Sequence, residues 1–170
     1  MQYNSTIYDE QGDFIHIKDG RNEFTKMTTD INELSIYNIL HTSGTKSCGI
    51  VNIIQLSNNF VKLENLDTSL NHCTMADIKH KMKTVKAFLQ NLGIMYIDWK
   101  RDNIGIGRLD GELKLFDFDV SGIIDLHTNE WLLPPPKCWA YRDAINAGMI
   151  TPKEIDDYAF NKGFTSKINI

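Results

Sequence analysis

The stretch YIDWKRDNIGIGRLDGELKLFDFD, residues 96–119, gathers five aspartates between short apolar runs. The runs IGIG and LKLFDF have the composition of strands, and Leu109-Asp110-Gly111 between them has the residues of a hairpin turn. The carboxylates therefore fall in loops and at strand ends. Side chains from such positions can converge on one point, so we expect residues 96–119 to contain the functional site.

Three polar residues of this stretch have a spacing that allows them to meet. Asp98 and Asn103 are five residues apart, and Asp117 follows fourteen residues after Asn103, across the predicted hairpin. Carboxylate and amide oxygens suit Mg²⁺, which binds through one or two carboxylates together with the phosphates of a substrate. A second carboxylate nearby is suited to accept a hydroxyl proton. The alternative interpretation is turn chemistry, because Asp and Asn are common at loop and strand ends.

Residues 98–103, DWKRDN, and residues 114–119, KLFDFD, resemble the catalytic loop and the metal-binding motif of eukaryotic-type protein kinases. The resemblance implies that Asp98 orients or deprotonates the acceptor hydroxyl, and that Lys100 steadies the transferred phosphoryl group. A lysine two residues after the catalytic aspartate is typical of the serine/threonine branch of that family.

The same resemblance implies that Asn103 and Asp117 hold Mg²⁺ and that ATP supplies the phosphoryl group. This sequence departs from the family at Tyr96-Ile97, which replaces His-Arg, and at Asp119, which replaces the glycine of Asp-Phe-Gly. The first change predicts that a basic pocket for a phosphorylated activation segment is absent. The second occurs in small-molecule kinases and in divergent protein kinases.

Residues 1–66 carry the pattern of an antiparallel sheet with one helix. Alternating segments from Tyr3 to Met27, separated by Asp/Gly/Asn turns, predict three strands, and a hairpin is predicted across Asn58-Asn59. Between them, Asp30-Ile-Asn-Glu33 has capping-box spacing ahead of apolar residues at helical intervals. We therefore expect an α+β unit with a sheet of about five strands.

Under the kinase resemblance, residues 1–66 correspond to a reduced N-lobe. Lys26 is then the candidate nucleotide-binding lysine, and Glu33 is its partner on the helix. The segment from Glu64 to Leu66 corresponds to the hinge beside the adenine of ATP. The resemblance thus names four candidate nucleotide-binding residues in this half of the chain.

Three of these assignments have alternatives, and for Glu64 the alternative is a solvated strand residue. Lys18, in FIHIK, resembles the family's lysine motif more closely than Lys26 does, but it leaves little chain before it for two strands. Both lysines therefore stay candidates. Glu33 also fits the role of a capping-box glutamate, which needs no partner outside its own helix.

Residues 67–170 are expected to form a truncated helical C-lobe that carries the catalytic loop. Apolar spacing predicts a helix from Met75 to Leu92, with Gly93 as its stop. Thr151-Pro152-Lys153-Glu154 predicts the start of another helix. Residues 156–160, DDYAF, resemble the start of the large C-lobe helix of the family, and the later helices of ordinary protein kinases are missing.

The role of the segment between the metal-binding motif and this last helix stays open. Trp131, Trp139 and the three prolines at 134–136 are suited either to a packed cover over the site or to a surface for a partner.

Composition narrows the function classes. The 170 residues carry a formal net charge of -4, without a broad basic field, so nucleic acid is not an expected partner. No apolar run approaches the ~20 residues of a membrane span, so no membrane association is expected. Three cysteines far apart, Cys48, Cys73 and Cys138, favour a reducing, cytoplasmic setting. The richness in Asn, Ile and Lys suits a large DNA virus, which would make this the host cytoplasm.

The expected fold is therefore α+β, a protein kinase-like two-lobed fold with a reduced N-lobe and a truncated C-lobe. The expected function is ATP- and Mg²⁺-dependent phosphoryl transfer to a hydroxyl by a minimal serine/threonine protein kinase. One alternative is a kinase mimic that binds and regulates another kinase or its substrate. A third is a small-molecule kinase, which Asp119 favours and Lys100 disfavours.

Overall fold

The computed structural model of the chain describes residues 6–8, 14–18, 22–44 and 48–165. These residues form an α+β structure with four α-helices and small antiparallel sheets, which confirms the expected class. The helices are α1 (Ile31–Ser43), α2 (Met75–Asn91), α3 (Trp139–Asn146) and α4 (Pro152–Gly163), with one short 3₁₀ turn, η1 (Arg101–Asn103). The strands are β1 (Thr6–Tyr8), β2 (Phe14–Lys18), β3 (Glu23–Met27), β4 (Ile53–Leu56), β5 (Phe60–Glu64), β6 (Ile94–Met95), β7 (Ile104–Ile106), β8 (Leu113–Leu115), β9 (Gly122–Ile124) and β10 (Trp131–Leu133).

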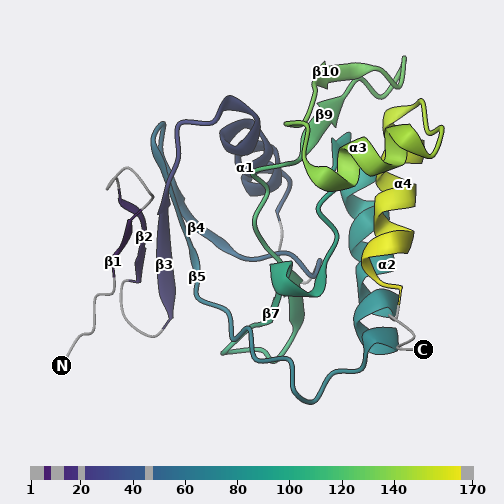
Figure 1. The fold of residues 1–170 in the computed structure, drawn as a ribbon. Helices are drawn as coiled ribbons and strands as arrows, with labels where there is room; N and C mark the ends of the chain where they lie inside the picture. The colour runs from purple at the N-terminus through teal and green to yellow at the C-terminus, as the bar shows by residue number, and fades with distance from the viewer. Residues whose placement is uncertain (1–5, 9–13, 19–21, 45–47, 166–170) are drawn as a thin grey trace.

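The largest sheet has five antiparallel strands in the order β1-β2-β3-β5-β4. The predicted strands before Met27 and the hairpin across Asn58-Asn59 are both confirmed. Helix α1 begins at the predicted cap, where the Asp30 carboxylate accepts a hydrogen bond from the Glu33 amide. In Figure 1 this sheet and α1 occupy one side of the molecule, and α2, α3 and α4 pack together on the other.

Helix α2 follows the sequence prediction closely. It is capped by a reciprocal box between Thr74 and Asp77, and it buries Ile78, Met82, Val85 and Leu89 along one face. The chain leaves the helix at Gly93, whose φ of 77° is costly for any residue with a side chain. After this turn the chain continues into β6 and then into residues 98–103, which resemble a catalytic loop.

Two small sheets support residues 96–119, which contain the candidate site. Strands β7 and β8 form the predicted hairpin, and β6 pairs with β9, which in turn pairs with β10. A parallel bridge between Ile50 and Leu115 ties β8 to the segment before β4. The end of β8 therefore lies beside the five-stranded sheet. Helix α4 starts with the predicted capping box of Thr151 and Glu154, whereas β10 and α3 had no counterpart in the sequence prediction.

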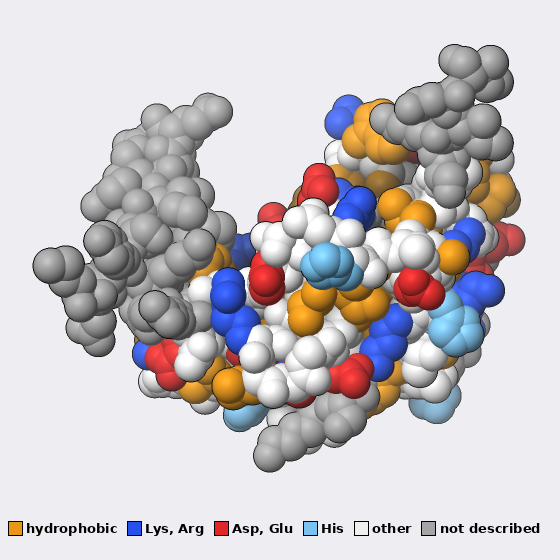
Figure 2. Space-filling model, turned by 90° about the horizontal axis from the view of Figure 1, so that it is seen from below, with side chains coloured by type: hydrophobic (Ala, Val, Ile, Leu, Met, Phe, Trp, Pro, Cys, Tyr) orange, Lys and Arg blue, Asp and Glu red, His pale blue; other side chains and the backbone are white. Residues whose placement is uncertain are grey.

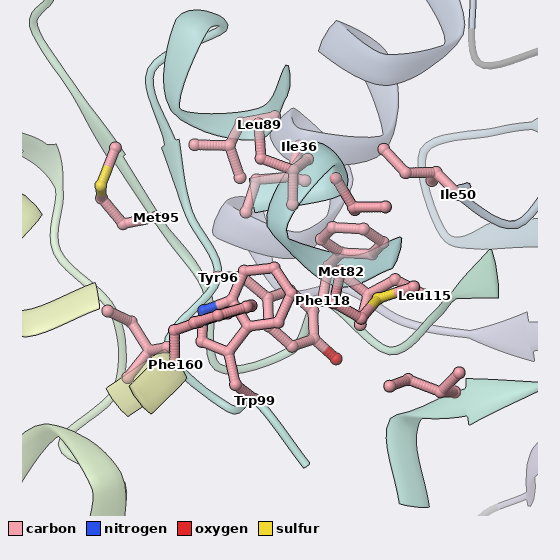
Figure 3. Packing of buried hydrophobic residues seen from close by; sticks show 14 of the residues in the cluster. Ile36, Ile50, Met82, Leu89, Met95, Tyr96, Trp99, Leu115, Phe118 and Phe160 are labelled. Carbon is pink, nitrogen blue, oxygen red and sulfur yellow. The ribbon is translucent and has the colours of Figure 1, made fainter. Parts of the chain in front are cut away.

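A chain of aromatic contacts runs through the core from α1 to α4. Tyr37 contacts Phe118 edge-on with ring centroids 5.6 Å apart, Phe118 contacts Tyr96 at 5.2 Å, and Tyr96 contacts Trp99 at 4.7 Å. Trp99 then meets Phe160 of α4 at 5.0 Å. Figure 3 shows Tyr96, Trp99, Phe118 and Phe160 together within the buried cluster. Such edge-to-face contacts add to the stabilisation from burial itself.

The surface carries mixed charge. On the face seen in Figure 2, the coloured basic and acidic side chains are interspersed and neither sign dominates an extended area. In the part of the chain that the structure describes, no helix combines the length and apolar character needed to cross a bilayer.

Candidate functional site

Lys26, on β3, forms ion pairs with carboxylates from two other elements. Its Nζ lies 2.7 Å from Oε1 of Glu33, in the first turn of α1, and 2.9 Å from Oδ1 of Asp117, just after β8. The side chains of Lys26 and Glu33 are 11% and 1% exposed, whereas that of Asp117 is 35% exposed. The group is therefore a buried lysine whose second carboxylate partner remains open to solvent.

Charge holds Lys26 in its ammonium form. Burial alone would lower the pKa of Lys26, but the negative charges of Asp117 and Glu33 raise this pKa above its ordinary value. Of the two roles expected for the Glu33 side chain, the structure shows that of a partner to Lys26, because the Glu33 carboxylate binds the Lys26 ammonium. Glu33 takes part in the helix cap only through its backbone amide, which donates to the Asp30 carboxylate. Lys18, the other candidate lysine, lies in β2, and its side chain falls outside the described residues.

Asp98, Lys100 and Asn103 form a second group in the catalytic-loop motif. The Lys100 Nζ lies 2.7 Å from Oδ2 of Asp98, and the Asn103 amide nitrogen donates to the same oxygen over 2.8 Å. Asn103 also donates to the backbone carbonyl of Asp98 over 3.0 Å. Both bonds use the amide nitrogen, and the amide oxygen of Asn103 is the atom of this side chain that can ligate a cation.

The backbone is strained at two points of the site. Ile97, directly before Asp98, has a φ of 68°, and Asp117 has a φ of 63°. This left-handed conformation is rare outside glycine and is least favourable for a β-branched residue such as Ile97. Strain of this kind persists only where surrounding contacts hold it, so the positions of both aspartates are imposed by the fold.

A buried aspartate on α4, Asp156, binds the backbone of Ile97 and two other side chains. The Asp156 Oδ1 accepts from the Ile97 amide over 3.0 Å and from the Trp99 indole over 2.7 Å, and Oδ2 accepts from Gln90 over 2.9 Å. Asp156 is fully buried, and that burial raises the pKa of its carboxyl even though its hydrogen bonds oppose the shift. Sequence analysis reached Asp156 only through its likeness to a helix start.

Asp119 adds a further carboxylate to this region. Partial desolvation, and after it the negative charge of Asp117, raise the pKa of Asp119 to about 6. Among the described residues, no group of three or more His, Cys, Asp or Glu side chains is arranged to hold a metal ion. A magnesium site of one carboxylate and one amide oxygen, completed by phosphates and water, does not require such a group.

A small apolar cavity of about 170 Å³ lies between the five-stranded sheet and β8. Its apolar walls are Phe24, Val51, Leu63, Leu66 and Phe116, and its polar edge is formed by Glu64, Asn65 and Thr68. Both predicted hinge residues therefore border it. Phe116 directly precedes Asp117, so one segment of the chain contributes to both the cavity and the Lys26 group.

The carboxylate of Glu64 is occupied by partners within the protein. Its Oε1 accepts from the Asn52 amide and from the Lys114 Nζ, each over 2.7 Å, and Lys114 also pairs with Asp110 at 2.7 Å. Lys114 is 4% exposed, and although burial opposes it, its bonds to Asp110 and Glu64 raise its pKa. Sequence analysis assigned Lys114 no role, although a lysine inside an apolar strand run was a signal of a buried ion pair.

No protein-family model matches this chain, and neither does any curated protein. The case for a function therefore rests on the geometry of the site.

Proposed function

We propose that this protein is an ATP- and Mg²⁺-dependent phosphotransferase with a kinase-like two-lobed fold, in which residues 1–66 and 67–170 form the lobes. The observation that carries the proposal is the contact of Lys26 with both Glu33 and Asp117. Lys26 and Asp117 are 91 residues apart in sequence, and the resemblance gives them the roles of phosphate-binding lysine and metal-binding aspartate. A charged lysine fixed beside an open carboxylate suits a nucleotide phosphate bound with its metal ion.

The surrounding residues fit ATP and Mg²⁺. The apolar cavity bordered by Leu66 and Phe116 suits a flat adenine ring, and Phe116 directly precedes Asp117, which pairs with Lys26. Asn103 and Asp117 supply the amide and carboxylate oxygens that would hold Mg²⁺. When bound, the ion would neutralise charge on the phosphates.

The remaining groups have roles in the transfer itself. Asp98 is half-buried and is suited to orient the acceptor hydroxyl and take its proton. Lys100, whose pKa is raised by its hydrogen bond to Asp98 against the opposing effect of burial, stays cationic and would stabilise the charge of the transferred phosphoryl group. Phosphoryl transfer depends mainly on positioning and electrostatics, so these few groups are sufficient. Lys100 favours a serine or threonine acceptor.

A thermal-shift titration with ATP, with and without Mg²⁺, tests nucleotide binding directly. A ligand that binds only the folded state raises the melting temperature, so wild type should show a magnesium-dependent rise. Lys26→Met and Asp117→Ala should lose this rise, while Lys62→Met, which removes a strand lysine paired with Glu23, should keep it. A wild-type protein that shows no shift with ATP and Mg²⁺ would overturn the proposal.

The transfer step is tested separately with radiolabelled ATP. Asp98→Ala should lose transfer to the acceptor but keep the magnesium-dependent thermal shift, because Asn103 keeps its other hydrogen bond, to the backbone carbonyl of residue 98, over 3.0 Å. Wild-type binding of ATP without transfer to any hydroxyl acceptor would instead favour the alternative of a kinase mimic.

A further inference from the structure

We propose that the acceptor is a polypeptide segment in which a large apolar side chain lies next to the phosphorylated serine or threonine, and that this side chain packs against Trp139. The inference rests on the proposed phosphotransferase function. It comes from a cavity of about 630 Å³ that opens beside Asp98 and Lys100 and that the nucleotide site does not use.

Three parts of the chain line this cavity. The catalytic loop contributes one wall, α3 contributes the second, and α4 with the residues after it contributes the third. The polar and aromatic side chains among its lining residues are Asp98, Trp99, Lys100, Trp139, Asp143, Tyr158, Lys162 and Thr165. A substrate bound here therefore contacts the group that would take its hydroxyl proton.

The charges of the cavity are balanced within the protein. Lys100 pairs with Asp98, and Lys162 pairs with Asp143, which also accepts a hydrogen bond from the Tyr158 hydroxyl over 3.2 Å. Each carboxylate thus has its own lysine. A cavity with two paired acids and two paired bases gives no net attraction to strongly acidic or strongly basic sequences, so an uncharged neighbour of the acceptor residue fits best.

The aromatic wall is fixed in place. The Lys162 Nζ lies 5.0 Å from the ring centroid of Trp139 and 5.6 Å from that of Tyr158, while its ion pair with Asp143 ties α4 to α3. Trp139 is nevertheless 68% exposed. An exposed tryptophan held in one orientation is the kind of residue that contributes most at contacts with polypeptides.

The open rim of the cavity favours a polypeptide over a small molecule. Sites for small molecules enclose about 70–90% of the ligand surface. Here Trp139 is 68% exposed, and the side chains of Lys100 and Lys162 are 49% and 45% exposed, so the rim is accessible to a chain segment that extends beyond the cavity. A chain segment crossing the opening can place one side chain inside and leave the rest outside.

The reaction at this site balances as a simple transfer. The serine or threonine oxygen forms a bond to the γ-phosphorus of ATP, and the bond between that phosphorus and the β–γ bridging oxygen breaks. The hydroxyl proton moves to the Asp98 carboxylate, and ADP leaves.

A positional peptide library with a fixed serine or threonine, radiolabelled ATP and Mg²⁺ tests the inference. Wild type should select large apolar residues at one position beside the acceptor and should show no selection for clustered charge. Trp139→Ala should lose that selection and lower kcat/KM for the selected peptide by about tenfold or more, mainly through KM. Trp139→Phe should recover part of the loss.

Two controls separate this inference from the proposed function. Trp139→Ala should keep the magnesium-dependent thermal shift with ATP, and Leu109→Ala, which shortens an apolar side chain that is 88% exposed elsewhere, should leave peptide selection unchanged. Selection for charged neighbours, an unchanged selection in Trp139→Ala, or transfer only to small hydroxyl compounds would each overturn the acceptor assignment. If wild type did not bind ATP, the phosphotransferase proposal itself would be overturned.

Discussion

The carboxylate of Asp156 lies 3.0 Å from the backbone nitrogen of Ile97, although the two residues are 59 positions apart. This bond joins α4 to the one β-branched residue among the described positions that has a left-handed backbone, directly before Asp98. The geometry of the candidate site therefore depends on a residue that lies outside it.

Replacing Asp156 should reveal this dependence. Asp156→Ala leaves the buried amide of Ile97 and the indole N–H of Trp99 without their acceptor, and each lost partner costs about 1–3 kcal/mol. Asp156→Asn keeps an acceptor oxygen and should lose less. Urea unfolding of both variants measures the difference. Equal stability of Asp156→Ala and wild type would contradict this account.

The Lys26–Glu33 pair should behave as a coupled unit. Lys26→Met removes the cation nearest to a carboxylate that is 1% exposed, and breaking a buried pair from one side costs about 3–5 kcal/mol. The double variant Lys26→Met/Glu33→Gln removes both charges and should recover much of this loss. Denaturant unfolding of the two single variants and the double variant gives the coupling energy. Additive losses would show that the pair is not coupled.

Asp119 should make stability depend on pH. An unfolded aspartate has a pKa of 3.8 and that of folded Asp119 is about 6, so the folded state binds more protons between these values. The resulting stabilisation is complete below the lower value and is lost as pH rises through the upper one.

Asp119→Asn lacks this titration. As the pH is raised from about 5 to about 7.5 without divalent cations, the melting temperature of Asp119→Asn should therefore increase relative to that of wild type. Asp102→Asn, which removes an exposed negative charge, controls for the change in net charge. A constant difference between wild type and Asp119→Asn over this range would contradict the prediction.

Gly163, at the end of α4, should not accept a side chain. A Cβ at this position would lie 1.7 Å from the backbone oxygen of Trp99, so the helix or the catalytic loop would have to move. Gly163→Ala should destabilise the protein by about 1–3 kcal/mol or more, and it should also weaken phosphoryl transfer because Trp99 adjoins Asp98. Asn161→Ala, at an exposed position of the same helix, should change neither by much. Thermal unfolding and the transfer assay measure both effects.

Much of the fold could be predicted because its signals are local. The caps of α1 and α4, the turn at Gly93 and the hairpin between β7 and β8 each depend on a few neighbouring residues. The position of Asp117 relative to Lys26 could not be predicted from local signals, since it depends on long-range contacts, among them the bridge between Ile50 and Leu115 and the ion pair between Lys114 and Glu64, that bring β8 to the sheet. The resemblance named Lys26 and Asp117 separately and did not predict their contact.

Other features depend on residues that are distant in sequence, so the sequence near each of them contains only a weak signal. Strand β10 has three residues and exists through its pairing with β9, so its sequence alone does not define it. The carboxylate of Glu64 binds Lys114, 50 positions away, and no local pattern indicates that pair. The position of Trp139 beside Asp98 likewise depends on how α3 packs against α4.

Phe118 links the position of Asp117 to the packing of the core. Its ring lies between those of Tyr37 and Tyr96, and it directly follows Asp117. Turning Asp117 away from Lys26 by moving this segment would empty a fully buried aromatic position, and loss of a buried phenylalanine ring costs about 3–5 kcal/mol. The contact between Asp117 and Lys26 is thus coupled to the aromatic packing that joins α1 to α4.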